Sequence, residues 1–260
     1  MGVKAHLSFL RAIYKLEINT AMEYRFNFIS QTIGMFVNDI FWIFFWFLIF
    51  QKFGSIGNWG YHEMLLLYAV LPTSFGLVMI LFGNWAYLSK MIEEGNLDYY
   101  LTLPKNELLH ILIKSRYSGM GDVLFGLGLA VFTLSLNQVP LFVVMVVSSG
   151  LILLGWTLFT NSFSFYVGRF QDAARAAREA IIIVSGYPFS VYSGATKFIL
   201  LFIIPAGFVA GVPVELLTHF SMKWFLITVG FSLAFFAFSV WFFYNGLKRY
   251  ESGNMLAMRG

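Results

Sequence analysis

The chain has no cysteine among its 260 residues. This excludes a disulfide framework, a catalytic thiol and any metal site built on cysteine. Charged residues are also scarce, at 12% of the chain, whereas soluble domains contain about a quarter. Apolar residues make up 59% and aromatic residues 20%, more than a soluble core of this size can bury. We therefore expect an all-α, polytopic membrane protein.

Several functional signatures are missing as well. There is no G-x-x-x-x-G-K-[ST] sequence, so this chain has no P-loop of its own for ATP phosphates. There is no G-x-S-x-G hydrolase motif, and the basic residues flank apolar runs rather than forming a nucleic-acid surface. The four histidines lie in separate segments without metal-pair spacing: His6, His62, His110 and His219. We expect no catalytic residue, no metal, no cofactor in this chain and no nucleic-acid partner.

Apolar stretches follow one another along most of the chain. There are seven, at 26–50, 64–88, 119–136, 141–167, 181–192, 198–214 and 224–247. A spanning helix needs about 20 residues, so four are long enough, the third is adequate, and the two between 181 and 214 are short or interrupted. Charges interrupt residues 1–25, so we expect no cleaved signal peptide there. This segment predicts a helix in the cytoplasmic interface, although an ordinary exposed helix fits equally well.

Lysine and arginine are distributed unevenly between the loops. Of the 17 basic residues, 14 lie before the first stretch, after the second, after the fourth and after the last. The positive-inside rule then predicts six spans with cytoplasmic N- and C-termini in a single transmembrane domain over 1–260. The breakers in 198–214 leave two versions of the fifth span. We prefer a short span from near Ala177 to near Pro188 with a re-entrant 195–214; otherwise 177–193 lies on the inner surface and 198–214 crosses.

The longest polar stretch inside the chain is the cytoplasmic loop 89–118. Gly95-Asn96 is a turn or helix-stop signal, after which residues 97–103 predict a short apolar-faced turn ended by Pro104. Asn106 is placed to cap a helix that runs into the third span through Lys114 and Arg116. A solvated hairpin that merely joins two spans is the alternative.

Residues 94–104, E-G-N-L-D-Y-Y-L-T-L-P, resemble the E-G-x-L-D-x-x-L-x-x-P signature of permease subunits of type 2 ABC exporters. The segments 187–194 and 203–213 are similar to the branch with chains of about 260 residues and six spans. The resemblance implies a re-entrant segment before the last span and a coupling helix from Glu93 to Leu103 that docks on an ATPase. The coupling residues it implies are Glu93, Glu94, Gly95, Leu97, Asp98, Tyr100, Leu101 and Pro104.

The same resemblance implies partners and a location. A separate P-loop ATPase, in two copies, would bind ATP, and a second permease chain, identical or paralogous, would complete the pathway. The protein would sit in the prokaryotic cytoplasmic membrane, the cell inner membrane, and work in efflux of a hydrophobic or amphiphilic compound. A stand-alone secondary transporter or channel is the competing class, and it predicts function without a partner.

A few polar groups lie at membrane depth. Asn38 and Asp39 fall near the centre of the first span, where a carboxylate costs about 2.5–3.5 kcal/mol, so they line a pathway or anchor helices together. Asn161 is a third candidate for the pathway. Asp122 is expected to pair with Arg116 near the inner interface.

Other residues of the apolar stretches are assigned to packing or to lipid. Glycines 119, 121, 126 and 128 predict close helix packing. Trp42 and Trp46 are expected to face lipid for the most part, and Trp59 and Trp85 to anchor the chain at the membrane interface.

Overall fold

The computed structural model describes residues 3–102 and 106–250, which are helical apart from short connections. Within these residues the β pairing is a single isolated bridge between Ile56 and Trp59. The expected all-helical class is confirmed. The long apolar runs dictate it, because a helix satisfies every backbone hydrogen bond inside its own segment, as a lipid environment requires.

Within the described residues, four helices are long and apolar enough to span a membrane. They are α2 (Arg25–Phe53), α3 (Tyr61–Phe82), α8 (Val139–Ser162) and α13 (Met222–Leu247). The apolar helix α7 (Gly119–Thr133) has 15 residues, about 22 Å at 1.5 Å per residue, which is short of a 30 Å hydrocarbon core. The six-span count therefore stays a prediction.

Shorter elements connect these helices. Before α2 lies α1 (Val3–Glu23), and after α3 come η1 (Trp85–Tyr87), α4 (Leu88–Glu93), α5 (Leu97–Leu101) and α6 (Glu107–Leu112). Around α8 lie η2 (Leu136–Gln138), α9 (Ser164–Val167) and α10 (Gln171–Ser185). Before α13 come η3 (Phe189–Val191), α11 (Gly194–Phe202), η4 (Gly207–Gly211), which is a turn of π-helix, and α12 (Val212–Thr218).

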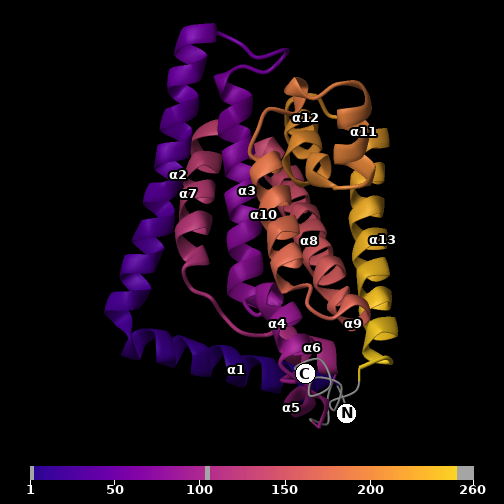
Figure 1. The fold of residues 1–260 in the computed structure, drawn as a ribbon. Helices are drawn as coiled ribbons and strands as arrows, with labels where there is room; N and C mark the ends of the chain where they lie inside the picture. Colours follow the sequence, from indigo (N-terminus) through magenta and orange to yellow (C-terminus); the bar gives the residue numbers. More distant parts are fainter. Residues whose placement is uncertain (1–2, 103–105, 251–260) are drawn as a thin grey trace.

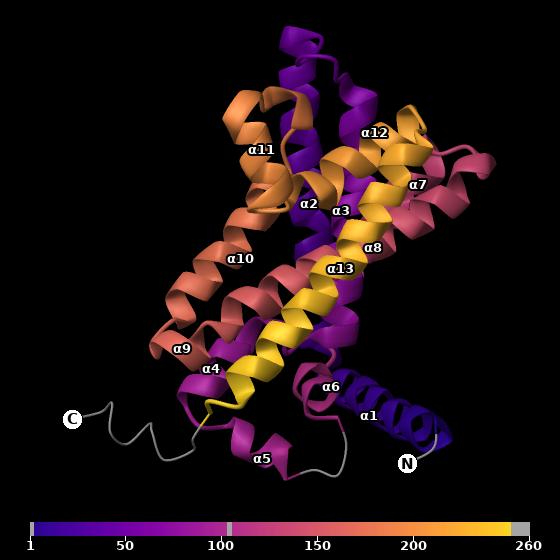
Figure 2. The same ribbon diagram turned by 90° about the vertical axis from the view of Figure 1, so that its right-hand side faces the viewer.

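The long helices form one bundle with α3 and α8 at its centre (Figure 1). The outer helices α2 and α13 are mostly exposed and lie at opposite sides, which leaves their apolar surfaces for lipid or another chain. Both views place α1, α5, α6 and the end of α13 at the lower end, and α11 and α12 at the upper end (Figures 1 and 2). The two ends of the bundle therefore differ, with α1, α5 and α6 at the lower end and α11 and α12 at the upper end.

The segment around the disputed fifth span is built from two parts. The helix α10 rises beside α8 from the level of α9 towards α11 and α12 (Figures 1 and 2). The following pair, Gly194–Phe202 and Gly207–Thr218, is bent by 79°, which is the geometry of a broken span or a re-entrant loop. Pro205 lies in the break and lacks the amide hydrogen that a continuous helix needs.

The loop 89–118 is partly as expected. The Gly95 stop is confirmed: this residue has φ +73°, and the amides of Gly95 and Asn96 close the end of α4 on the carbonyls of Ile92 and Met91. The Asn106 cap is also confirmed, because its Oδ1 accepts from the amide of Leu109 at 2.9 Å.

The helix after Asn106 does not run into the third span, so that prediction was wrong. It ends at Leu112, and 113–118 is non-helical. Its backbone bonds instead to the end of α3: Gly83 donates to the Lys114 carbonyl, and the Arg116 amide donates to the Met79 carbonyl at 3.0 Å. These bonds use groups at the C-terminal end of α3 that have no partner within that helix.

Candidate functional site

The segment α4–α5 presents one exposed and one anchored side. Asp98, Tyr99 and Leu101 are exposed, with Tyr99 68% accessible. Leu97 is fully buried and Tyr100 is half-buried, so α5 is fixed to the bundle through its apolar face. The predicted coupling residues thus present Glu94, Asp98 and Leu101 outward, whereas Pro104 lies outside the described residues. Gly95 forms the turn between α4 and α5.

Glu93 points into the protein. Its Oε1 accepts hydrogen bonds from the amides of Phe170 at 2.7 Å and Gln171 at 2.8 Å. The hydroxyls of Ser89 and Ser164 approach the same oxygen, each at 3.3 Å. A carboxylate in this position caps the N-terminus of α10, where its charge meets unpaired amides and the positive end of the helix dipole.

Asn161 belongs to the same polar cluster. Its Oδ1 accepts from the amide of Ser89 at 2.9 Å, and its Nδ2 donates to the carbonyl of Thr157 at 2.7 Å. Ser89 also shares a short hydrogen bond with Ser164. Asn161 therefore joins α8 to α4 and does not line the cavity that contains Asn38 and Asp39.

A cavity of about 340 Å³ lies at membrane depth between α2, α3, α7 and α10. We name it the membrane pocket; its walls include Asn38, Asp39, Trp42, Tyr68, Phe75, Asp122, Ile182, Ile183, Gly186 and Tyr187. Most of these side chains are apolar or aromatic, with a few polar groups converging among them. That composition is usual for small-molecule sites.

Two carboxyl groups meet in the membrane pocket. Asp39 on α2 and Asp122 on α7 are 6% and 3% exposed, and their side chains are within hydrogen-bonding reach of each other. One oxygen of each, Oδ2, has no hydrogen-bond partner among the described residues. Two carboxylates this close together repel each other, so a cationic group bound between them would be stabilised. Asp39 was predicted for the pathway, whereas nothing in the sequence pattern indicated that Asp122 would join it.

The prediction that Asp122 pairs with Arg116 was wrong. The guanidinium of Arg116 lies over the ring of Tyr87, 5.1 Å from its centroid, as in a cation–π contact. Asp122 sits in the first turn of α7, beyond the non-helical stretch 113–118. An uninterrupted helix would have placed residues 116 and 122 in one helix, and the non-helical stretch 113–118 removes that relation.

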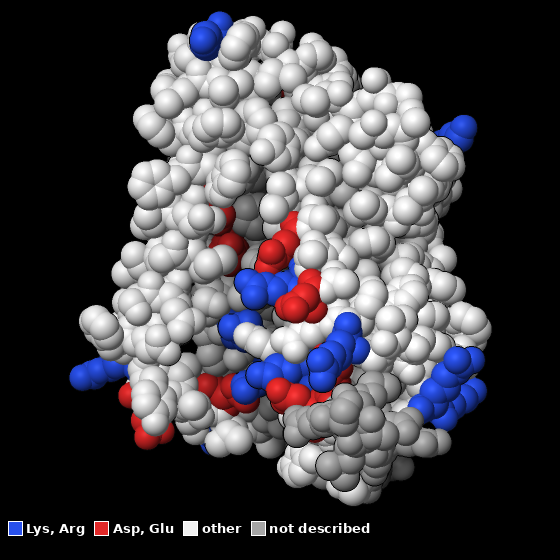
Figure 3. Space-filling model, viewed as in Figure 1, with Lys and Arg blue, Asp and Glu red and all other residues white. Residues whose placement is uncertain are grey.

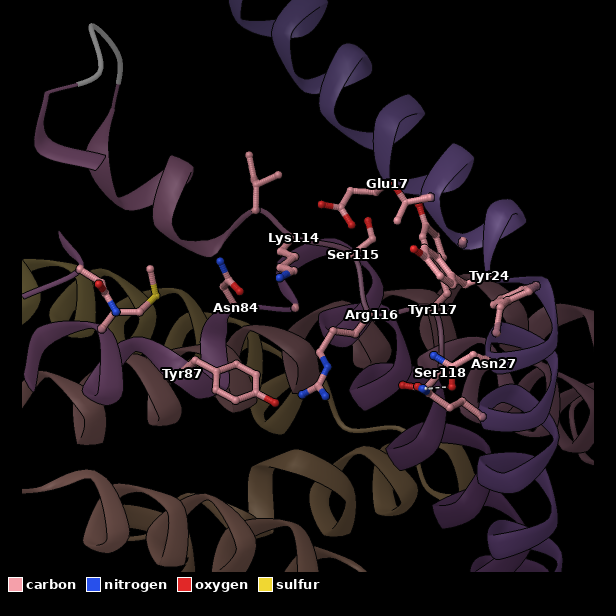
Figure 4. A pocket seen from close by; sticks show the side chains of 18 of the residues that line it. Glu17, Tyr24, Asn27, Asn84, Tyr87, Lys114, Ser115, Arg116, Tyr117 and Ser118 are labelled. Atoms are coloured by element: carbon pink, nitrogen blue, oxygen red, sulfur yellow. Dashed lines mark hydrogen bonds between the residues drawn. The ribbon is translucent and has the colours of Figure 1, made fainter. Parts of the chain in front are cut away.

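A larger cavity, of about 940 Å³, opens below the membrane pocket. We name it the vestibule; it lies between α1, the lower end of α2 and the segments 83–100 and 113–118. Figure 4 shows Lys114, Arg116 and several tyrosines around it, with Glu17 on the side of α1. The hydroxyl of Tyr14 on α1 donates to the carbonyl of Leu81 at 2.7 Å and ties this wall to the bundle.

One face of α2 and its lead-in lines both cavities. Tyr24, Asn27 and Gln31 border the vestibule, and Asn38 and Asp39 border the membrane pocket. Their spacing follows the helical period, so they form one polar stripe. On the side of the molecule seen in Figure 3, acidic and basic side chains gather in a hollow near the middle and along the lower edge. The stripe therefore borders both cavities, from the lower end of α2 to its middle.

Aromatic residues of the same type differ in their exposure and contacts. Trp42 is exposed, but Trp46 is buried, and its indole nitrogen donates to the hydroxyl of Tyr68 at 3.3 Å. The ring of Trp46 also meets Tyr187 edge-on, with centroids 5.6 Å apart. Tyr68 and Tyr187 were missed as pocket residues. The only related feature in the sequence is that Tyr68 lies four residues before Pro72 in the same apolar stretch.

Comparison with known proteins adds one finding. The family model described as "ABC-2 family transporter protein" matches residues 36–254, which include α3 to α13 and most of α2. Searches of curated proteins and of solved structures returned no match.

Proposed function

This chain belongs to the ABC-2 family of transporter proteins, and we propose that it is the permease subunit of an exporter driven by separate ATPase chains. Membership makes it an integral membrane transport component that works with an ATPase. The observation that carries the finer proposal is the polar stripe of α2, which lines two cavities in succession. A permease needs such a route, because a polar group crossing lipid alone meets a barrier of several kcal/mol.

The proposed topology has six spans and both termini in the cytoplasm. Its spans are the four long helices with α7 and α10, and its re-entrant segment is the bent pair α11–α12. The common position of α1, α5, α6 and the end of α13 at the lower end supports an even number of crossings (Figures 1 and 2). The lower end would face the cytoplasm, where most lysine and arginine residues are found.

The proposed docking element is α4–α5 with the turn at Gly95. Exposed Asp98, Tyr99 and Leu101 give it a mixed acidic, aromatic and aliphatic surface, while buried Leu97 holds it to the bundle. Two ATPase chains would bind ATP and press on two such elements, one on each permease chain. The second permease chain, identical or paralogous, would cover apolar surface left exposed by the outer helices and close the pathway.

The proposed substrate is an amphiphilic compound with a cationic or polar head. The membrane pocket offers aromatic walls for its apolar part and the carboxyl pair Asp39–Asp122 for its head. A ligand can drive the transport cycle only if it binds one conformational state more tightly than the other. A carboxyl pair that is buried in one state and open to the vestibule in the other would supply that difference in affinity.

The proposal is tested by tagging the chain, isolating it from native membranes in mild detergent and identifying every chain that co-purifies. We expect a P-loop ATPase in stoichiometric amount. With a single cysteine at Tyr99→Cys, a short bifunctional reagent should link the two proteins. The matched control is Phe220→Cys, which is also exposed but lies between α12 and α13. A protein purified alone in several detergents, and active without a partner, would favour a secondary transporter or channel.

A further inference from the structure

We propose that Glu93 is a positioning residue that joins the docking element to α10, so that movement of α4 and α5 reaches the wall of the membrane pocket. The inference rests on the proposed function, because it requires an ATPase to move α5. The resemblance placed Glu93 on the docking surface, whereas its carboxylate points the other way, into contacts with α9 and α10.

The first step is the character of the Glu93 contact. The N-cap of α10 is Phe170, whose side chain cannot accept a hydrogen bond from the first amides of the helix. Glu93 supplies that acceptor from another element, at 2.7 and 2.8 Å from the amides of Phe170 and Gln171. Hydrogen bonds to a carboxylate are about twice as strong as neutral ones, so the contact binds α4 firmly to the start of α10.

A second contact holds the same two segments together. Arg178, two turns further along α10, donates from Nη1 to the carbonyl of Ala86 at 3.2 Å. On the other segment, Ala86 lies seven residues before Glu93. The residues 86–93 thus run antiparallel to the first half of α10 and hold it at both ends. Two attachment points prevent α4 from turning about one of them, so the segments move as a unit.

The other end of α10 forms part of the membrane pocket. Ile182, Ile183 and Gly186 line that cavity, followed by Tyr187 just after the helix. A helix of 15 residues is about 22 Å long and transmits displacement along its axis because its hydrogen bonds lie along it. A shift of α4 therefore has a direct mechanical connection to the pocket wall.

The test uses the assembled complex and the absence of native cysteine. A single cysteine at Ile183→Cys, which is exposed in the pocket wall, reports the state of α10 through its rate of labelling by a small thiol reagent. Labelling with and without ATP, and transport per ATP hydrolysed, are measured for Glu93→Ala and Glu93→Gln. The matched control is Asp172→Asn, which removes an exposed carboxylate in the first turn of α10 that makes no hydrogen bond or ion pair to α4 among the described residues.

In Glu93→Ala we expect the ATP-dependent change in labelling, and the transport per ATP, to fall about tenfold. Glu93→Gln should lie between this variant and the parent, because its amide oxygen still accepts while the charge is lost. Asp172→Asn should behave as the parent. An unchanged ATP response in both Glu93 variants would overturn the inference, and Glu93→Gln gives this answer even if the alanine variant fails to assemble. No ATP response in the parent chain would instead overturn the proposed function, and the inference with it.

Discussion

Gly126 on α7 should be among the least replaceable small residues of the bundle. A Cβ at this position would lie 2.8 Å from the carbonyl oxygen of Ala69 and closer still to the hydroxyl of Thr73, both on α3. Two of the neighbouring atoms belong to backbone, which cannot move aside as a side chain can. Gly126→Ala should therefore cost about 1–3 kcal/mol in overpacking.

Gly128, two residues further on, provides the matched control. A Cβ there meets nothing within 4 Å, so Gly128→Ala should stabilise α7 by about 1 kcal/mol through helix propensity. Gly126→Ala gains the same helix propensity, so the two alanine variants should differ by the overpacking cost alone, about 1–3 kcal/mol in free energy of unfolding. At about 2–4 °C per kcal/mol, the gap in melting temperature should be about 2 °C or more.

The assay is thermal unfolding in detergent, followed by the fraction that remains monodisperse on size-exclusion chromatography. The packing of α7 on α3 also holds Asp122 opposite Asp39, so Gly126→Ala should reduce transport as well. Equal melting temperatures for Gly126→Ala and Gly128→Ala would refute the claim that glycine contacts set the distance between α3 and α7.

Three other substitutions test the docking element, the membrane pocket and the helix cap. Asp98→Lys reverses a charge on the docking surface and should reduce co-purification of the ATPase at unchanged melting temperature; unchanged binding and transport would count against docking there. Asp39→Asn should weaken binding of a cationic amphiphile about tenfold, in a fluorescence titration, and leave a neutral analogue within about twofold; equal losses for both ligands would exclude an electrostatic role. Asn106→Ala removes the cap of α6 and should cost about 1 kcal/mol of stability, measured as a lower melting temperature. An unchanged melting temperature would show that the cap does not stabilise the protein.

Much of the architecture is predictable from local signals. Apolar length identifies the four long helices, and turn chemistry identifies the stop at Gly95 and the cap at Asn106. The glycines of α7 predict close packing, although only three of the four touch another helix: a Cβ at Gly119, Gly121 or Gly126 would collide with α2 or α3. These features succeed because each depends on a few neighbouring residues.

The candidate site was harder to predict, because its residues meet through tertiary packing. The stretch 113–118 leaves the helix to bond with the end of α3, and this break brings Asp122 to Asp39 instead of Arg116. Trp59 and Trp85, expected as interface anchors, are 1% and 3% exposed, since both are covered by neighbouring segments. A tryptophan side chain suits a membrane interface and a buried position equally well, so the sequence alone could not decide between the two.

The most direct test of the central claim is transport by the purified complex in proteoliposomes. The permease is reconstituted with its ATPase, and movement of a fluorescent cationic amphiphile is followed after ATP is added to the side that carries the ATPase. We predict transport that requires ATP, requires the ATPase and is lost on removal of either. Transport by this chain alone, or transport driven by an ion gradient without ATP, would contradict the account.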